Sequence, residues 1–201
     1  VIDQTLLPLA FEVRTLRCVE DAATAIRDMV VRGAPLIGVT TAYGVALALR
    51  EHPGDSSLAA AIATLLATRP TAVNLRWAAE RMRRTVATLP PAERAARAYS
   101  EAAAIAEEDV ASCAAIGRHG LSLLRELGRG RGGERINVLT HCNAGWLACV
   151  DWGTALAPVY AAHEAGLPVH VYVDETRPRS QGALLTAFEL GAHGVPHTVI
   201  A

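Results

Sequence analysis

Hydrophobic positions in the first 135 residues recur with the spacing of helices. In residues 19–31 the apolar side chains stand three or four positions apart, at Val19, Ala22, Ala23, Ile26, Met29 and Val30. Gly33 and Pro35 interrupt this pattern. The same spacing predicts further helices over residues 35–51, 57–69, 72–89 and 91–127, with Thr71 as a possible cap before the third of these. We therefore expect a mainly helical N-terminal region.

The pattern changes after residue 135. Residues 136–141 form a continuous apolar run, which is typical of a strand buried on both faces. The next segments alternate between helix and strand: a helix over 153–166, a strand over 167–175, a helix over 181–194 and a strand over 195–201. This β-α-β-α-β order predicts an α/β fold with a parallel, doubly wound sheet.

The two patterns predict a division into domains. We expect a helical domain over residues 1–127, a Gly- and Arg-rich linker over 128–135 and the first half of a sheet domain over 136–201. The first residue is Val, and the last residues read as a strand that continues. We therefore expect the sequence to be part of a longer protein, with the second half of the sheet domain absent.

Composition narrows the class of protein. Hydrophobic residues make up 51% of the chain, and the formal net charge is -1, which argues against a nucleic-acid binder that depends on phosphate contacts. All 19 basic residues are Arg, which excludes a Schiff-base lysine and a P-loop lysine within this chain. The longest uncharged run does not read as a membrane span, and the four cysteines form no C-x-x-C pair, so we expect a reduced, cytoplasmic protein. The His residues are scattered along the chain, so we expect no metal site. No G-x-G-x-x-G follows the first strand, which argues against a dinucleotide-binding site.

Parallel sheets of this kind place their active sites beyond the carboxyl ends of the strands. Cys142 lies at such an end, followed by the small, flexible sequence Asn143-Ala144-Gly145. An isolated Cys is more often a buried apolar residue than a reactive thiol. A helix beginning directly after Cys142 would lower the pKa of the thiol and favour a bound anion. His141 is adjacent, but neighbours on a strand point to opposite faces, so a Cys-His dyad is not expected.

Three Arg- or Gln-bearing segments are candidate anion sites. Arg32, Gly33 and Ala34 precede a helix with Pro35 in its first turn, an arrangement suited to phosphate, although the local pattern alone slightly favours an exposed surface Arg. Arg69 precedes another helix start, where a capping turn is the alternative. Gln181 begins a helix after a charged loop and could donate to a phosphate or a sugar hydroxyl, with a solvated loop as the alternative.

Several long motifs, taken together and in order, resemble the methylthioribose-1-phosphate isomerase family of methionine salvage. They are DQTLLP, IRDMVVRGAPLIGVTTAYGVALA, RPTAVNLRWAAERM, THCNAG, WGTALAPVY and DETRPRSQGALLTAFEL. The resemblance covers nearly the whole chain. The superfamily also includes ribose-1,5-bisphosphate isomerases and regulatory subunits of the initiation-factor exchange complex, and the motifs THCNAG and VRGAP favour its enzyme branch.

The resemblance implies a Rossmann-like sheet domain and roles for individual residues. Cys142 matches the catalytic cysteine, Arg32 with Gly33 and Ala34 matches the phosphate-binding segment, and Arg69 and Gln181 match further substrate-binding positions. The second catalytic residue of the family is an Asp that would follow Ala201, so the 201-residue chain is expected to be inactive alone.

The resemblance also implies the reaction and the partners. The expected reaction converts 5-methylthioribose 1-phosphate to its ketose without a cofactor, in a homodimer of the full-length protein. The expected ligand is a small sugar phosphate. Alternatives are 5-deoxyribose 1-phosphate or ribose 1,5-bisphosphate as the substrate, or a non-catalytic regulatory module with the same fold.

Overall fold

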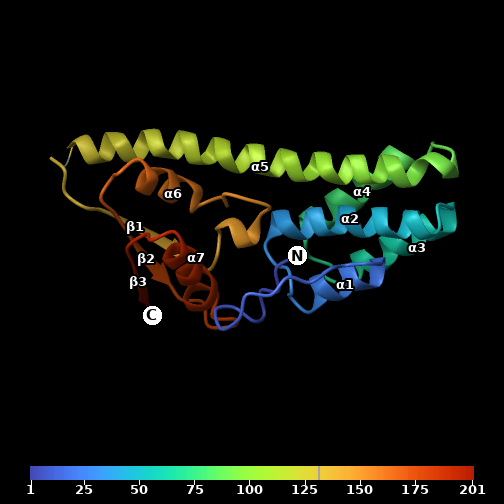
Figure 1. Cartoon of the computed structure of the whole chain (residues 1–201), viewed down its shortest axis with the longest axis horizontal. Coiled ribbons are helices and arrows are strands. Elements are labelled where there is room, and N and C mark those ends of the chain that lie inside the picture. Colours follow the sequence, from blue (N-terminus) through green and yellow to red (C-terminus); the bar gives the residue numbers. More distant parts are fainter. Residues whose placement is uncertain (131) are drawn as a thin grey trace. The chain divides into compact units, whose positions relative to one another are not determined.

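The computed structural model describes residues 1–130 and 132–201 (Figure 1). These residues form seven α-helices and one three-stranded sheet, together with a short 3₁₀-helix and a π-helical segment. The chain divides into two compact units. The helical unit comprises Val1–Leu6 and Phe11–Glu108, and the sheet unit comprises Leu7–Ala10 and Asp109–Ala201. Within the described residues, no helix is both long enough and apolar enough to cross a membrane.

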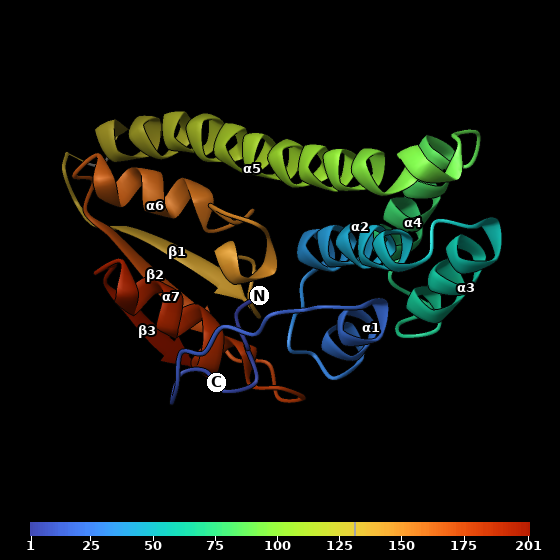
Figure 2. The same cartoon turned by 45° about the vertical axis from the view of Figure 1, so that its right-hand side comes forward.

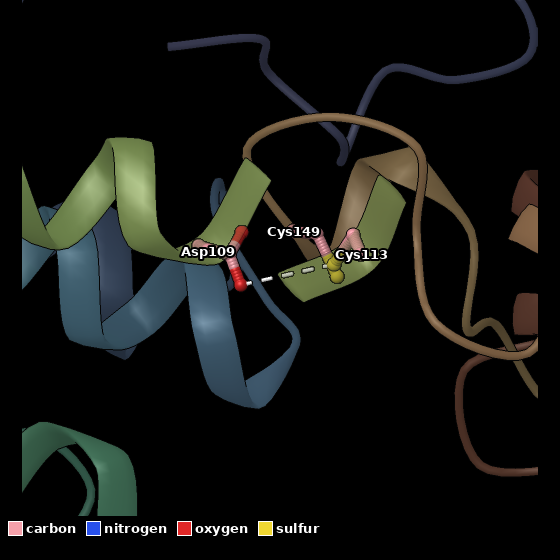
Figure 3. A group of neighbouring side chains, drawn as sticks. All are labelled: Asp109, Cys113 and Cys149. Atoms are coloured by element: carbon pink, nitrogen blue, oxygen red, sulfur yellow. Dashed lines mark hydrogen bonds between the residues drawn. The ribbon is translucent and has the colours of Figure 1, made fainter. Parts of the chain in front are cut away.

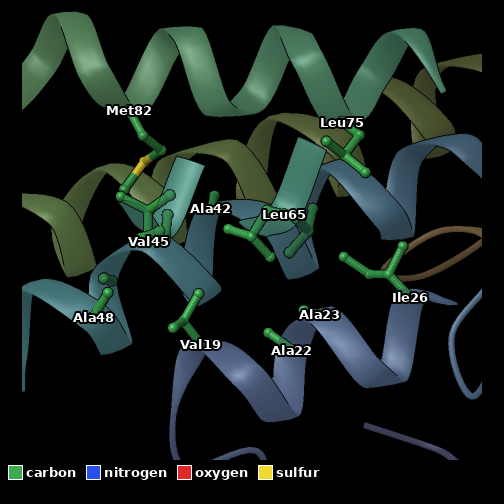
Figure 4. Packing of buried hydrophobic residues seen from close by; sticks show 14 of the residues in the cluster. Val19, Ala22, Ala23, Ile26, Ala42, Val45, Ala48, Leu65, Leu75 and Met82 are labelled. Atoms are coloured by element: carbon green, nitrogen blue, oxygen red, sulfur yellow. The ribbon is translucent and has the colours of Figure 1, made fainter. Parts of the chain in front are cut away.

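The helical unit is built around one apolar core (Figure 4). Its helices are α1 (Val19–Arg27), α2 (Ala34–Glu51), α3 (Asp55–Leu66), α4 (Val73–Val86) and the first part of α5 (Pro91–Gly130). Helix α2 is central, and a Cβ atom at its Gly44 would lie 3.0 Å from the Ala22 Cβ of α1 and 3.2 Å from a Leu65 methyl of α3. The lack of a side chain at Gly44 therefore allows three helices to pack closely.

The predicted helices of this unit are present, with one error in capping. Ala72, rather than Thr71, is the residue before α4, and no side chain caps that helix. The extended backbone of Ala72 (φ -76°, ψ 101°) places Thr71 one residue too early to act as the N-cap.

Helix α5 continues through the start of the expected linker (Figure 2). Residues 128–130 are helical, Arg131 lies outside the described residues, and Gly132 and Gly133 form a turn with φ values of +63° and +89°. A helix that is already formed propagates through a Gly at a cost of about 1 kcal/mol, which explains why Gly128 and Gly130 do not end it. The two units divide within α5, and the domain boundary expected at residue 127 stays a prediction.

The sheet unit confirms the predicted β-α-β-α-β order and the α/β class. Strands β1 (Ile136–His141), β2 (Val169–Asp174) and β3 (His197–Ile200) are parallel, in the order β1-β2-β3. Register places Val171 opposite both Val138 and His197. Helices α6 (Ala157–Glu164) and α7 (Ala187–Ala192) connect the strands and share a core with the alternating valines of β2.

One face of the sheet is covered and the other is open. Ile136 and Thr140 of β1 are buried, whereas Leu139, which points to the other face, is 68% exposed. The expectation that β1 is buried on both faces is therefore wrong for the described residues, because α6 and α7 contribute to one core with the inward side chains of β2.

Both connecting helices are shorter than expected. Helix α6 begins at Ala157, not at Gly153, because Gly153 has a φ of +80°, which no α-helix contains. The segment after β2 begins as a π-helix over Gly182–Thr186 and becomes α-helical only at Ala187.

Candidate active site

Cys142 lies immediately after β1, at the carboxyl end of the strand. Its backbone is left-handed, with φ at +61°, which is uncommon for a residue that carries a Cβ. The half-buried thiol donates a hydrogen bond from Sγ to the Oε1 of Gln181, at 2.9 Å. Gln181 follows β2, the neighbouring parallel strand, so two of the predicted site residues come together at one edge of the sheet.

The helix start expected directly after Cys142 is not there. The next helical element is η1, a 3₁₀-helix of three residues (Trp146–Ala148), and α6 begins only at Ala157. The expected effect of a helix dipole on the thiol is therefore wrong. Residues 142–147, which we call the cysteine loop, are instead fixed by side chains from the segment that follows β2.

The π-helical segment presents two residues to Cys142. A π-helix pairs positions five residues apart, and such segments occur frequently at functional sites. Gln181 and Thr186 are five apart and both contact Cys142: Gln181 accepts from its thiol, and the Thr186 hydroxyl donates to its carbonyl oxygen at 2.6 Å. The side chain and the backbone of Cys142 are thus held from one element.

Glu189 is fully buried beneath the cysteine loop and accepts four hydrogen bonds. Its Oε1 accepts from Asn143 Nδ2 at 2.8 Å and from the Leu147 amide at 3.1 Å. Its Oε2 accepts from the Trp146 amide at 2.9 Å and from the Tyr160 hydroxyl at 2.8 Å. Burial raises the pKa of Glu189, and the four donors act in the opposite direction by favouring the ionised form.

Gly145 is required by this carboxylate. A Cβ atom at residue 145 would lie 2.5 Å from the Glu189 Cδ and closer still to Oε2. From the sequence, the motif Asn143-Ala144-Gly145 suggested a flexible turn open to a ligand. In the structure the space beside Gly145 is occupied by the Glu189 side chain, and Asn143 is bonded to the same carboxylate.

Glu175 fixes the start of the segment that carries Gln181. Its Oε1 accepts from the amides of Thr176 at 2.6 Å and Gly182 at 3.1 Å, and its Oε2 accepts from the amide of Ala183 at 3.1 Å. The loop before Gln181 is therefore tied down by this carboxylate, because its oxygens satisfy amides that open the helical segment.

His141 does not pair with Cys142, as expected from strand geometry. Its Nδ1 lies 2.7 Å from the Oδ2 of Asp174, its register partner on β2. Both side chains belong to the open face of the sheet, and His141 is 68% exposed.

The Arg candidates belong to the helical unit, whereas Cys142 and Gln181 belong to the sheet unit. Arg32 is 4% exposed, which rules out the alternative of a surface Arg. Gly33 has a φ of 92° and precedes α2, whose first residue is the exposed Ala34. Arg69 is half-buried in the turn between α3 and α4, where its carbonyl oxygen accepts from the Ala72 amide at 3.0 Å.

Asp109, Cys113 and Cys149 form a second cluster in the sheet unit (Figure 3). Their ligand atoms lie within 4.8 Å of one another, and a carboxylate with two thiols is a donor set that zinc accepts. Burial raises the pKa of both thiols, which favours their neutral forms. Asp109 also accepts from the Val150 amide at 2.8 Å, so the cluster ties α5 to the segment after η1. No spacing in the sequence pointed to this group.

Comparison with known proteins decides the family. The sequence model of the Initiation factor 2 subunit family matches residues 30–201. The chain belongs to this family. The resemblance inferred from the motifs is thereby confirmed at the level of the superfamily.

The curated relatives of this chain carry an enzyme name. The methylthioribose-1-phosphate isomerase of Methylorubrum populi is 69% identical over 201 residues, which is 100% of this chain and 55% of the relative. The protein of the same name from Methylobacterium nodulans is 67% identical over the same shares. The chain thus spans about half the length of the curated relatives it matches.

Solved structures of the family share the fold. The 5-methylthioribose 1-phosphate isomerase of Pyrococcus horikoshii superposes with a TM-score of 0.86 at 38% identity, over 100% of this chain and 56% of that one. The translation initiation factor eIF-2B, subunit delta, of A. fulgidus gives a TM-score of 0.86 at 42% identity, over 100% and 59%. Both branches of the family are therefore structurally close to this chain.

The residues that hold the cysteine loop were not predicted from the sequence. Glu189 is the one charged residue in the apolar stretch LLTAFEL, and a buried carboxylate among apolar neighbours is a detectable signal. Thr186 and Tyr160 carried no such signal, because hydroxyl-bearing side chains are common at helical positions of every kind.

Proposed function

We propose that the whole protein is an aldose–ketose isomerase that converts 5-methylthioribose 1-phosphate to 5-methylthioribulose 1-phosphate. The observation that carries the proposal is the contact between the thiol of Cys142 and Gln181 at the carboxyl end of the parallel sheet. Its position agrees with the active-site rule for such sheets. The names of the curated relatives support the choice of reaction and substrate.

The substrate sets the chemical demand. An aldose phosphorylated on its anomeric oxygen does not open to a free aldehyde, so the enzyme assists ring opening and then moves a hydrogen from C2 to C1. This requires an acid near the ring oxygen and a base near C2. Cys142 supplies one of these groups. The second is the Asp that the family resemblance places after Ala201, and both a proton route and a hydride route remain compatible with this pair.

The segments that carry Arg32 and Arg69 would bind the phosphate. Arg32 is buried beside the start of α2, where backbone N–H groups and the helix dipole favour an anion. Arg69 would provide a second cation, and Gln181 would orient both the thiol and the sugar. Arg is suited to this task because its guanidinium binds phosphate through two parallel hydrogen bonds.

The second candidate function is a non-catalytic regulatory module. The observation that favours it is the similarity to the A. fulgidus initiation-factor subunit, which equals the similarity to the isomerase structure in TM-score. Binding of the sugar phosphate without turnover by the full-length protein would support this reading. The homodimer and the cytoplasmic location are part of the isomerase proposal, not of this alternative.

The test replaces Cys142 in the full-length protein. Cys142→Ala and Cys142→Ser are each expected to reduce turnover of 5-methylthioribose 1-phosphate by about 10²- to 10⁴-fold, because an acid–base group is lost. Cys18→Ala, in the helical unit, is the matched control and should retain activity. Turnover by Cys142→Ala equal to that of the unmodified protein would contradict the proposed function. Parallel assays with 5-deoxyribose 1-phosphate and ribose 1,5-bisphosphate identify the preferred substrate, and the 201-residue chain alone is predicted to be inactive.

A further inference from the structure

We propose that Glu189 is a positioning residue that holds the cysteine loop, and through it the thiol of Cys142, in the reacting orientation. This inference rests on the proposed function of Cys142. Glu189 lies too deep to touch a substrate, since its exposed fraction is 0%. Its effect on the reaction is therefore transmitted by the residues that it binds.

The cysteine loop fits closely around the Glu189 carboxylate. Each oxygen of Glu189 accepts two hydrogen bonds, and three of the four donors belong to the cysteine loop: the Asn143 amide group and the backbone N–H groups of Trp146 and Leu147. Four donors match the hydrogen-bonding capacity of an ionised carboxylate. The loop wraps around both oxygens of this carboxyl group.

Burying the Glu189 carboxylate has a cost in free energy. Taking a carboxylate out of water is expensive even when it is hydrogen-bonded, and an apolar side chain of similar volume would fill the same space without that cost. Packing alone therefore does not account for a carboxylate at residue 189. The need to fix the cysteine loop accounts for the carboxylate. This loop has little regular structure of its own, and its backbone N–H groups need an acceptor that an apolar side chain lacks.

A continuous set of hydrogen bonds leads from Glu189 to Cys142. Asn143 Nδ2 donates both to Glu189 and to the hydroxyl oxygen of Thr186, at 3.1 Å. The Thr186 hydroxyl in turn donates to the carbonyl oxygen of Cys142. Each donor is thus directed by the acceptor before it, and the left-handed backbone of Cys142 lies at the end of the series.

One continuous segment carries the three side chains that hold Cys142 and its loop. Gln181 directly precedes the π-helix η2 (Gly182–Thr186), Thr186 is its last residue, and Glu189 lies in α7, which follows without a break. The π-helical turn aligns the first two, and an ordinary helical step of three residues brings the third beside them. The segment therefore fixes the thiol, the carbonyl and the loop of Cys142 in one geometry.

The experiment compares three variants of the full-length protein. Glu189→Gln keeps the volume but replaces one acceptor oxygen with an NH₂ group that faces N–H donors. Thr186→Val removes the hydroxyl that holds Cys142. Thr41→Val is the matched control, because Thr41 is equally buried and donates to a backbone carbonyl, that of Ile37, at 2.8 Å in the helical unit.

Two readouts separate positioning from general stability. For the first two variants we expect kcat to fall by about 10²-fold with little change in KM, since a small misplacement of a reacting group costs that much. The rate at which iodoacetamide alkylates Cys142, followed by mass spectrometry between pH 6 and 9, should change by about 5-fold or more because a thiol's reactivity depends on its surroundings. The control should match the unmodified protein in both.

The outcomes are distinct. If Glu189→Gln and Thr186→Val are folded and their Cys142 reacts at the unmodified rate, the inference is overturned. If Glu189→Gln does not fold, Thr186→Val alone decides. If the unmodified protein shows no isomerase turnover, the proposed function fails, and the alkylation rates still decide whether Glu189 and Thr186 position the thiol.

Discussion

The replacement Gly145→Ala tests the packing of the cysteine loop on Glu189. The added Cβ would lie 2.5 Å from the Glu189 Cδ and closer to Oε2, so the carboxylate has to move. Its movement breaks the two hydrogen bonds to Oε2, from the Trp146 amide and the Tyr160 hydroxyl. Hydrogen bonds to a charged group contribute about 1.5–3 kcal/mol each, so we expect the free energy of unfolding to fall by roughly 3–6 kcal/mol. That is a large share of the roughly 5–15 kcal/mol typical of a folded protein.

Urea unfolding followed by circular dichroism measures this change. Gly191→Ala is the control, because the nearest atom to its added Cβ would be His197 Cε1 at 3.8 Å, an ordinary contact. Removing a Gly from helix α7 should stabilise the protein by about 0.5–1 kcal/mol. A free energy of unfolding for Gly145→Ala within about 1 kcal/mol of that of the unmodified protein would contradict the clash, since Glu189 would then have room to accommodate the added Cβ.

Two further predictions concern charge and pH. Arg81 binds Glu101 at 2.6 Å and Glu108 at 2.7 Å on α5, so Arg81→Gln should lower the free energy of unfolding by about 1–2 kcal/mol in urea titrations. Arg81 lowers the pKa of Glu108. The contribution of this carboxylate to the free energy of unfolding is therefore present at pH values above its ordinary pKa of 4.5 and is lost as the pH falls below that value. Arg81→Gln should make the free energy of unfolding depend less on pH in this acid range. Burial raises the pKa of Cys149 and Cys113 above the ordinary 9.0, so the unfolded chain releases these protons first. Thermal stability should therefore decline as the pH rises past 9, and the decline should be smaller in Cys149→Ala; equal declines would contradict the buried thiol.

Local pattern predicted the elements better than their contacts. The pattern of apolar residues predicted β1, β2 and β3, and the alternation of strands with helices predicted that these strands are parallel. The strand pattern also placed Cys142 and Gln181 at carboxyl ends, and the structure joins them. The pattern did not predict the exposure of Leu139, because a continuous apolar run does not say whether anything covers the second face.

The contacts that hold the cysteine loop could not be predicted from the local sequence pattern. Glu189 binds Asn143, which lies 46 residues earlier, and no spacing rule connects two such positions. The π-helical turn between Gln181 and Thr186 shifts the helical register by one residue, so a regular helix drawn over 181–194 misplaces the later side chains. Gly145 was interpreted as flexibility, whereas its role depends on a carboxylate that only the fold brings near.

The contact between Gly145 and Glu189 has an evolutionary consequence. A lineage that keeps the carboxylate accepts only glycine at residue 145, and it gains from an amide at residue 143 that serves the same oxygen. Once residue 189 becomes a small apolar residue such as Ala, neither constraint remains, and both loop positions can change freely. Homologues that no longer use the thiol should therefore differ together at residues 143, 145 and 189. The loss of the activity would then be visible in residues that do not touch the substrate.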